Sequence, residues 1–552
     1  MNTVLFLFTF LFIIFSILGY GMLYLKLVNL NHKNLSLGIE GIIGCFFYTL
    51  ISFLTHLFFA HNFVHNLIIN FFGLIFFFYF FVKNSNFYNK KIFKFLLIIP
   101  LFIILLFLSK NNEDFPYYHL PFMINLIEHK IQFGIGHFNY SYRTPSSLFY
   151  LQSLFYLPGI KYYLLHASGL IILIFSNLFL LDKFFFIENK TNNLIKIFSC
   201  IVFVFINLFF IRLAEYGTDR AGQIIAFIIF IIFLQLINSK NDFLENSKIL
   251  FILIIYLISI KSYFIVYLLL FFPLLYFVIR NKSLKEILNS SIFVFSLFLF
   301  LILYFFINFS ISGCLITALR QSCVDKFFWT TPLELIDHYN KWYELWAKSG
   351  ASPNYRISNV DEYIQYFNWV PNWLNHYFFT KGSDTLLGIL AICIVFIIFL
   401  KKNIKLKKIY KYFFLYLLII SMFSIWFYKH PDLRYGGYVL LASIFFIPLS
   451  IYLSRFDIKK NNFFIVITIL IIISLNVRNA IRINNEFKRE DPYVYKNFPF
   501  FYINNVKYEE KIIKEDLKIY IVSKDMCWAT PSPCLHGNIN FKKISGYNYF
   551  YP

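Results

Sequence analysis

Charged residues are scarce in this sequence. Asp, Glu, Lys and Arg make up 14 % of the 552 residues, whereas a soluble domain carries roughly 25 %. Hydrophobic residues make up 59 % of the chain, and aromatic residues make up 22 %. Apolar runs long enough to cross a bilayer recur along the chain. The shortage of charge excludes an ordinary soluble domain, and the apolar runs predict an all-α polytopic membrane protein.

Targeting and nucleotide-binding features are also missing. No basic segment precedes the first apolar run, and no clear small-residue cleavage site follows it. We therefore expect a membrane span there rather than a cleaved signal peptide. The sequence has no internal repeat at a fixed period and no nucleotide-binding motif. An enzyme with this sequence would need a substrate that is activated by a group other than a nucleotide.

Hydropathy predicts about fourteen transmembrane helices. The apolar stretch 146–158 is too short to cross a bilayer, so we expect a helix lying at the membrane interface. The predicted spans lie near residues 3–24, 36–60, 67–82, 92–109, 161–181, 196–213, 221–238, 248–260, 262–279, 287–308, 386–400, 412–428, 438–453 and 463–477.

Basic residues divide the loops into two sets. When 146–158 is counted as interfacial, clusters of Lys and Arg fall on alternate loops, and loop 401–411 carries six lysines and no acid. The positive-inside rule makes these loops cytoplasmic. Most of the net charge of +22 then sets topology, and no nucleic-acid partner is required. Both termini, the loops 110–160 and 309–385 and the tail 478–552 are predicted to be extracytoplasmic, as in a multi-pass protein of a bacterial inner membrane.

The cysteines fall into two classes. Cys45, Cys200 and Cys393 lie within apolar runs and are expected to be small buried residues. The other four form two close pairs in predicted extracytoplasmic segments, where disulfides persist. A zinc site is the less favoured alternative because neither pair has CxxC spacing. The predicted disulfides join Cys314 to Cys323 and Cys527 to Cys534.

Two neighbouring acids follow the fourth predicted span. The segment KNNEDFPYYHLPF, residues 110–122, contains Glu113 and Asp114 on the predicted outer face. One carboxylate could act as a general base on an acceptor hydroxyl, and either could help hold a divalent cation such as Mg or Mn. The alternative is a solvated loop whose acids stabilise the N-terminus of a helix near 116–130, with Pro116 in its first turn.

A second acidic loop lies on the same predicted face. The segment AEYGTDRAGQ contains Glu215 and Asp219 between two apolar spans, so both carboxylates must lie near the membrane surface. Ionisable groups at membrane depth usually face a partner or a polar cavity. The alternative for Asp219 is an ordinary helix cap. Two acidic loops on one face are more informative than either loop alone.

This arrangement resembles the GT-C superfamily of integral membrane glycosyltransferases. That family includes bacterial oligosaccharyltransferases, protein O-mannosyltransferases and lipid A aminoarabinose transferases, which take sugars from a polyprenyl-phosphate carrier. The resemblance covers roughly 92–240 and implies that Asp114 or Glu113 is the catalytic base or positions the acceptor, whereas Asp219 and Glu215 hold a metal or the substrate. The segments EDFPYYHLPF, EYGTDRAGQ and CWATPSPC look most like uncharacterised bacterial relatives.

The predicted topology and the resemblance together divide the chain into five parts. These are additional transmembrane helices at 1–91, a GT-C-like core at 92–308, an extracytoplasmic loop at 309–385, C-terminal transmembrane helices at 386–477 and an extracytoplasmic tail at 478–552.

Three further residues are candidates for the site. Lys261 interrupts an apolar run and could hold a lipid phosphate, or it could simply snorkel to the interface. Arg434, in HPDLRYGGY, could bind phosphate oxygens, with Gly436 and Gly437 permitting close approach of a ligand; the alternative is a tight turn with an exposed charge. His119 could support the acids, although a solvated histidine is the simpler interpretation.

The sequence therefore favours a membrane glycosyltransferase that moves a sugar from a polyprenyl-phosphate carrier to a lipid, glycan or protein acceptor on the outer face of the inner membrane. A transporter or flippase of lipid-linked saccharides is the alternative. A transporter predicts related halves with interrupted helices and a binding site near the bilayer midplane. A non-catalytic scaffold would place no demand on the two acidic loops to meet.

Overall fold

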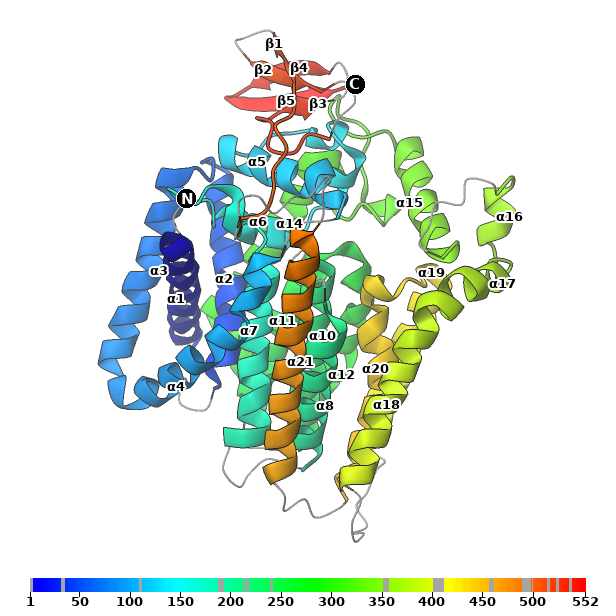
Figure 1. The fold of residues 1–552 in the computed structure, drawn as a ribbon. Helices are drawn as coiled ribbons and strands as arrows, with labels where there is room; N and C mark the ends of the chain where they lie inside the picture. The colour runs from blue at the N-terminus through cyan, green and yellow to red at the C-terminus, as the bar shows by residue number, and fades with distance from the viewer. Residues whose placement is uncertain are drawn as a thin grey trace.

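The computed structural model is a bundle of long helices with a small group of strands at one end (Figure 1). We call the end that carries the strands the strand end. Both ends of the chain lie toward it (Figure 1). The structure describes residues 3–30, 35–108, 112–186, 193–211, 213, 218–238, 242–350, 357–400, 412–455, 461–488, 498, 500–513, 517–522, 526–535 and 539–552.

Helices account for most of the described chain. The first ten are α1 (Thr3–Leu27), α2 (Leu37–His56), α3 (Phe63–Lys83), α4 (Ser85–Ile98), α5 (Leu120–Glu128), α6 (Ser147–Ser153), α7 (Ser168–Leu181), α8 (Asn193–Phe209), α10 (Thr218–Asn238) and α11 (Phe243–Ile260). The others are α12 (Phe271–Arg280), α13 (Leu284–Asn289), α14 (Ser291–Ser312), α15 (Leu333–Lys348), α16 (Val360–Ile364), α17 (Val370–Trp373), α18 (Ser383–Leu400), α19 (Phe413–Lys429), α20 (Tyr438–Leu453) and α21 (Asn461–Phe487).

The described helices confirm a polytopic membrane architecture. Within the described ranges, eleven helical segments are long and apolar enough to cross a membrane, and α8 and α19 are shorter apolar helices. The predicted span at 92–109 is not one continuous helix. After α4 the chain continues as two 3-10 turns, Ile99–Leu101 and Ile103–Phe107, because Pro100 has no N–H to continue the α-helical hydrogen bonds. The count of fourteen crossings stays a prediction.

The stretch 146–158 forms only the short helix α6, which confirms that it does not cross the membrane as a helix. All seven of its residues are buried, and α6 packs against α2 and α5. The hydroxyl of Ser52 on α2 donates to the carbonyl of Tyr150 at 2.7 Å. A polar bond of this kind fixes neighbouring helices in an apolar environment.

Glycine sets the spacing of the N-terminal helices. A Cβ atom on Gly19 of α1 would lie 1.9 Å from the carbonyl oxygen of Gly73 on α3, so the two backbones touch. Small residues allow this close approach between membrane helices. In the same way, a Cβ atom on Gly38 of α2 would lie 2.2 Å from the carbonyl oxygen of Phe175 on α7. The N-terminal helices are therefore packed directly on the rest of the bundle.

The tail forms two small sheets at the strand end. Strand β2 (Lys518–Ile521) pairs antiparallel with β1 (Glu509–Ile512) and parallel with β3 (Cys534–Leu535), and β4 (Asn540–Ile544) pairs with β5 (Tyr547–Tyr551). Both predicted disulfides, Cys314–Cys323 and Cys527–Cys534, are present, and the other three cysteines are buried and unbonded to one another. The cysteine predictions are confirmed.

Three backbone hydrogen bonds fasten the tail to the helical body. The Trp528 N–H donates to the carbonyl of Pro116 at 3.0 Å. The Phe133 N–H donates to Asn548 at 2.8 Å, and the Phe550 N–H donates to Phe133 at 2.9 Å. The tail therefore braces the segment that follows Asp114.

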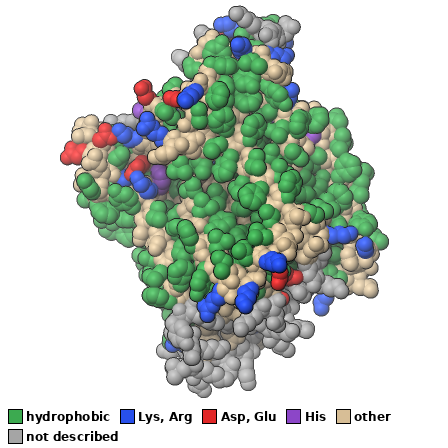
Figure 2. Space-filling view, turned by 180° about the vertical axis from the view of Figure 1, so that it is seen from behind, with side chains coloured by type: hydrophobic (Ala, Val, Ile, Leu, Met, Phe, Trp, Pro, Cys, Tyr) green, Lys and Arg blue, Asp and Glu red, His purple; other side chains and the backbone are tan. Residues whose placement is uncertain are grey.

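Hydrophobic side chains cover most of the face seen in Figure 2, and charged side chains gather toward its edges. Many large apolar side chains on α3, α14, α18 and α21 are exposed, including Phe71, Phe295, Ile398 and Leu470. Lipid, rather than another protein surface, is the expected neighbour of such a belt.

The predicted orientation can be tested with alkaline phosphatase fusions, which are active only outside the cytoplasm. A fusion after Lys282, in the turn between α12 and α13, should be inactive because the adjacent basic residues retain this loop in the cytoplasm. A fusion after Pro552 should be active. The reverse pattern, or activity at both positions, would contradict the topology. Expression of each fusion is checked by immunoblot.

Candidate active site

Asp114 begins the helical segment of the first acidic loop. The π-helical turn Phe115–His119 follows it and continues into α5, which confirms the predicted helix near 116–130. The Asp114 side chain makes no capping hydrogen bond to this helix. It is half-buried, whereas the neighbouring Glu113 is exposed. Of the two acids, Asp114 is therefore the one that faces the interior.

The electrostatic surroundings of Asp114 join four predicted site residues. Burial raises the pKa of Asp114 above its ordinary value, and the positive charges of Arg434 and Lys261 oppose that rise. The negative charges of Asp219 and Glu113 add to it. Asp114 therefore lies within electrostatic reach of Asp219, Lys261 and Arg434, although the four residues come from four separate stretches of sequence.

Asp219 lies in the first turn of α10. Its Oδ1 accepts a hydrogen bond from the hydroxyl of Tyr263 at 2.9 Å and another from Thr218 at 3.4 Å. The helix dipole also favours a carboxylate in this turn. Asp219 is thus more than a helix cap, because a side chain from a different helical segment holds it.

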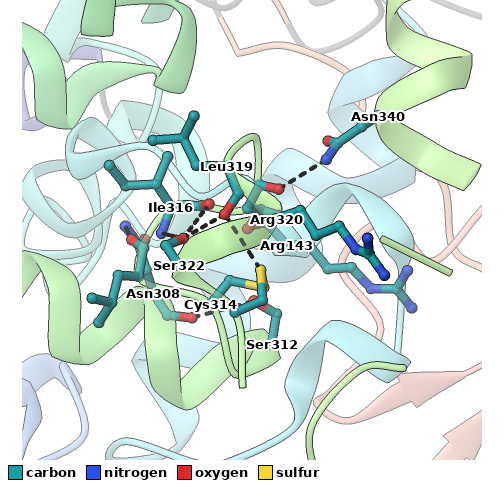
Figure 3. Close-up of a disulfide and its surroundings, with 12 residues drawn as sticks. Arg143, Asn308, Ser312, Cys314, Ile316, Leu319, Arg320, Ser322 and Asn340 are labelled. Carbon is teal, nitrogen blue, oxygen red and sulfur yellow. Dashed lines mark hydrogen bonds between the residues drawn. A yellow bond between two sulfur atoms is a disulfide. The ribbon is translucent and has the colours of Figure 1, made fainter. Parts of the chain in front are cut away.

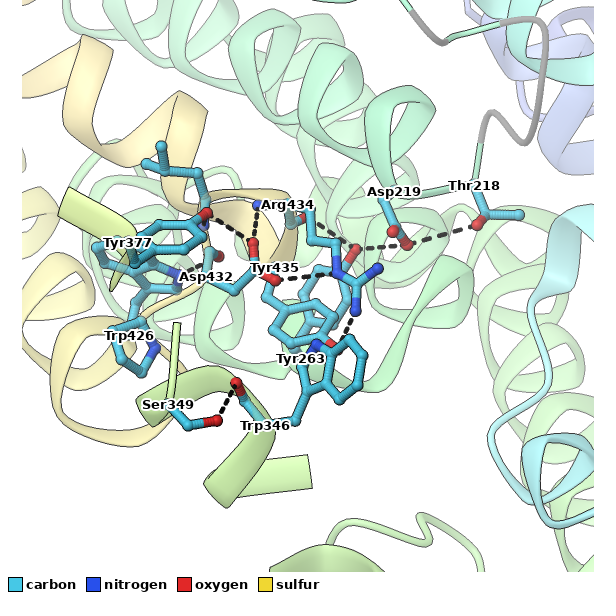
Figure 4. Close-up of polar contacts among 12 residues, drawn as sticks. Thr218, Asp219, Tyr263, Trp346, Ser349, Tyr377, Trp426, Asp432, Arg434 and Tyr435 are labelled. Atoms are coloured by element: carbon cyan, nitrogen blue, oxygen red, sulfur yellow. Dashed lines mark hydrogen bonds and ion pairs between the residues drawn. The ribbon is translucent and has the colours of Figure 1, made fainter. Parts of the chain in front are cut away.

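Arg434 lies between two sets of partners (Figure 4). Its Nε pairs with Asp432 Oδ2 at 3.0 Å, and its Nη2 donates to the Tyr435 hydroxyl at 2.9 Å. Asp432 is only 3 % exposed and also accepts a hydrogen bond from Tyr377 at 2.8 Å. On the other side, the Tyr263 hydroxyl reaches the Arg434 carbonyl at 3.3 Å as well as Asp219. The Arg434 side chain is 36 % exposed, but its charge is held by an ion pair and a hydrogen bond rather than standing alone in a turn.

In the structure, Gly436 and Gly437 permit a turn and close packing, whereas the sequence suggested that they permit close approach of a ligand. Gly436 has a φ of 91°, which a residue with a side chain rarely adopts, so it permits the turn into α20. A Cβ atom on Gly437 would lie 2.2 Å from the ring of Trp426. That glycine makes room for a tryptophan of α19 rather than for a ligand.

Lys261 marks a break in the helix. α11 ends at Ile260, Lys261 is extended, and a 3-10 helix over Ser262–Leu270 follows. Its side chain is half-buried and acts electrostatically on both Asp114 and His119. Its charge therefore lies within electrostatic reach of an acid from another loop.

His119 is not solvated as the simpler interpretation expected. It is 4 % exposed, and its ring lies 5.0 Å from that of Phe149 and 4.2 Å from that of Tyr118. Burial, and then the charge of Lys261, lower the pKa of His119 well below its usual range, which keeps the ring neutral. It lines a cavity of about 10 Å³, the space of one water molecule, together with His166 and Thr218.

Aromatic side chains line the same site. The rings of Tyr263 and Tyr435 lie 5.1 Å apart, and the guanidinium of Arg434 lies 5.9 Å from the ring of Trp346 on α15. The Tyr118 side chain interacts electrostatically with Asp114, Asp219 and Arg434. The 309–385 loop therefore contributes Trp346 of α15 to the wall of the site.

Sequence reasoning missed several residues that complete the site. Asp432 lies in the same quoted segment as Arg434, so an acid two residues before a candidate arginine was an available signal. Tyr263 lies two residues after Lys261, just past the interruption that the sequence revealed. Trp346 had no comparable signal. Glu215 lies outside the described residues.

The described residues do not form a metal site by themselves. Across the described ranges, no group of three or more His, Cys, Asp or Glu side chains is arranged to hold a metal ion. Asp114 and Asp219 face two cationic side chains, which is the opposite of the oxygen-rich shell that Mg²⁺ prefers. The divalent cation stays a prediction of the resemblance.

Comparison with known proteins gives one match. Residues 3–441 match a family described as a domain of unknown function, DUF8201. The chain belongs to the DUF8201 family. No curated protein and no solved structure matches it.

The DUF8201 match includes every residue assembled above. Asp114, Asp219, Lys261 and Arg434 all lie within residues 3–441, as does the disulfide of the 309–385 loop. Most of α20, all of α21 and the tail with its strands lie beyond the match. The site is therefore contained in the DUF8201 region, and the tail braces it from outside that region.

Substitution Asp114→Asn should stabilise the unliganded protein at pH 7.5. A raised pKa means that the folded state disfavours the charged form, so ionisation of Asp114 costs stability once the pH exceeds both pKa values. The gain in Tm should shrink as the pH falls through the folded pKa, and it should vanish below about pH 4, where the carboxyl is neutral in both states. Tm is measured in lipid nanodiscs.

The exposed neighbour provides the control for this experiment. Glu113→Gln should leave Tm nearly unchanged at pH 7.5 and at about pH 4, because that side chain already contacts water. A lower Tm for Asp114→Asn at pH 7.5 would show that the Asp114 carboxylate stabilises the fold. Such a result would contradict its assignment as a strained site residue.

Proposed function

We propose that this protein is a membrane glycosyltransferase of the GT-C type. It transfers a sugar from a polyprenyl-phosphate carrier to an acceptor hydroxyl at the outer face of a bacterial inner membrane. The observation that carries the proposal is that a half-buried carboxylate, Asp114, shares one site with Lys261, Arg434 and a second acid, Asp219. This combination suits a reaction that removes a proton and releases a phosphate.

Asp114 is the proposed general base. Burial raises its pKa, which makes the carboxylate a stronger proton acceptor than an ordinary aspartate. The acceptor oxygen forms a bond with the anomeric carbon of the sugar, and its proton passes to Asp114. The bond between the anomeric carbon and the phosphate oxygen breaks, and its electron pair leaves with the phosphate. Asp114 then returns the proton to solvent.

Lys261 and Arg434 are the proposed phosphate ligands. Two positive charges at the leaving group stabilise the negative charge that develops as the bond breaks. The ion pair with Asp432 and the hydrogen bond to Tyr435 fix the orientation of the guanidinium. Lys261 has a longer, more flexible stem and can follow a moving phosphate.

Asp219 and the rings of Tyr435 and Trp346 are proposed to bind the sugar. Asp219, held by Tyr263, is placed to accept hydrogen bonds from sugar hydroxyls. The rings of Tyr435 and Trp346 offer apolar faces on which the C–H groups of a sugar can pack.

A flippase of lipid-linked saccharides is the rival that the sequence left open. Its site is expected near the bilayer midplane, between related halves. Asp114, Lys261 and Arg434 instead lie where helical segments begin or end, at Phe115, Ile260 and Leu433. This placement favours chemistry at the membrane surface.

Asp114→Asn should abolish glycan modification in cells. Loss of a general base lowers the rate by roughly 10²–10⁴-fold, and the amide cannot accept the proton. Asp219→Asn should lower it too, because the amide changes the hydrogen bond with Tyr263. The readout is the surface glycan profile at matched protein level. Asp361→Asn, in an exposed ion pair with Lys341, is the matched control and should be fully active.

Retained activity in both site variants would overturn the assignment of these acids. A deletion strain separates the two classes of function. Accumulation of a polyprenyl-linked sugar in the outer leaflet is expected for a missing transferase. Accumulation in the inner leaflet would instead identify a flippase and contradict the proposal.

Lys261→Gln should raise the KM for the lipid-linked donor by about tenfold or more, since a charge-assisted contact to phosphate is lost. The KM for the acceptor should change little. Lys341→Gln, which removes an exposed lysine of α15, is the matched control. Equal rises in both KM values for Lys261→Gln would contradict a phosphate-specific part for this residue.

A further inference from the structure

A buried arginine outside the four-residue site has no acidic partner. Arg143 ends the 3-10 turn Tyr140–Arg143 and is only 6 % exposed. Its Nη1 is buried and has no hydrogen-bond partner among the described residues. Among the described carboxylates, none pairs with it; the groups that act on its charge are the hydroxyls of Tyr339 and Tyr343. A buried charge without a counter-charge is costly.

The surrounding structure holds the Arg143 side chain in place. Its Nε donates to the carbonyl of Gly136 at 3.1 Å, and the Thr317 hydroxyl binds its backbone carbonyl. The guanidinium lies 4.8 Å from the ring of Tyr339, which stacks on Tyr140 with centroids 5.0 Å apart and planes at 4°. The side chain extends from the region of the Cys314–Cys323 loop toward α15 (Figure 3). The Nη1 edge is the part left without a partner.

Arg143 also lines a partly open cavity. The cavity has a volume of about 10 Å³, the space of one water molecule, and lies between Arg143, Thr144 and Pro145 on one side and α14 and the disulfide loop on the other. Polar side chains contribute to the wall, among them Thr144, Ser262 and Thr317. Hydroxyl groups can donate to an anion that the arginine attracts.

This cavity adjoins the candidate active site. Ser262 of its wall lies between Lys261 and Tyr263 in the sequence. Tyr343 connects the two regions from the other side, since it interacts electrostatically with both Arg143 and Tyr435. A molecule that occupied both regions would place one group near Lys261 and a second group at Arg143.

We propose that Arg143 forms a second anion site, which binds a phosphate or carboxylate oxyanion on one of the two substrates. This inference rests on the proposed function only in taking the bound anion to be part of a substrate. The anion would supply the counter-charge that Arg143 lacks, accepting from Nη1 and from the hydroxyls of Thr144 and Ser262. The enzyme would then select a substrate with a negative charge in addition to the phosphate that Lys261 and Arg434 hold.

The first experiment measures anion binding without any transfer reaction. The full-length protein in nanodiscs is titrated with inorganic phosphate, and separately with acetate, at constant ionic strength, with Tm as the readout. Two saturable responses to phosphate are expected. Arg143→Gln should weaken one of them by at least about tenfold, and Lys261→Gln should weaken the other. Arg320→Gln, an exposed arginine paired with Asp337 at 3.0 Å, is the matched control and should keep both.

A second variant keeps the test decisive if Arg143→Gln fails to fold. Thr144→Glu places a carboxylate on the half-exposed wall beside Arg143. It should raise Tm without added anion and remove the same response, because the resident acid occupies the site. A full phosphate response in either variant would overturn the proposal. If Arg143→Gln loses the phosphate response in nanodiscs while Asp114→Asn leaves the glycans of cells unchanged, the anion site stands. The glycosyltransferase proposal is then rejected.

A third titration identifies which substrate, the lipid carrier or the acceptor, carries the oxyanion. Farnesyl phosphate and farnesyl diphosphate serve as short carrier analogues. If the second phosphate of a carrier occupies the site, Arg143→Gln should weaken diphosphate binding much more than monophosphate binding. If the acceptor supplies the anion, both lipids should bind the variant as they bind the wild type, and acetate or phosphate alone should show the loss. No loss with any of these probes would overturn the site.

Discussion

The candidate site depends on polar side chains that join three helical segments inside an apolar body. The buried amide of Gln223 on α10 donates to the carbonyl of Arg434 at 3.0 Å and accepts from the Val439 N–H at 3.2 Å. The Tyr263 hydroxyl spans the same gap between Asp219 and the Arg434 carbonyl. In a membrane environment the alternative to such bonds is an unsatisfied polar group, so these contacts fix the helices that carry the site.

The charged side chains in this region differ in how firmly their partners hold them. Arg434 is paired with buried Asp432 and is therefore held rigidly. Lys261 and Asp114 are half-buried and act on each other without a direct ion pair. Arg143 has no acid at all among the described residues. Charges in this part of the molecule thus range from one fixed by an ion pair to one without an acidic partner among the described residues.

Much of the architecture could be predicted because it follows from local composition. Long apolar runs gave the helices, the short run at 146–158 gave α6, and cysteine spacing in polar segments gave both disulfides. The two acidic loops were recognised because charge is rare in such a chain. Long-range pairings were not predictable in this way: that Tyr263 meets Asp219, or that Trp346 faces Arg434, depends on packing between segments far apart in the sequence. Hydropathy also cannot show a helix break such as that at Pro100.

The bonds between the tail and the helical body impose an order on biogenesis. Pro116 and Phe133 follow Asp114 closely, yet their backbone partners are Trp528, Asn548 and Phe550, near the other end of the chain. The early helices are synthesised and inserted into the membrane before those partners have been made. The turn that carries Asp114 consequently reaches its final support only after the whole chain has been synthesised and its tail has reached the same side of the bilayer. A partly inserted chain therefore lacks the support that the tail gives to the turn carrying Asp114.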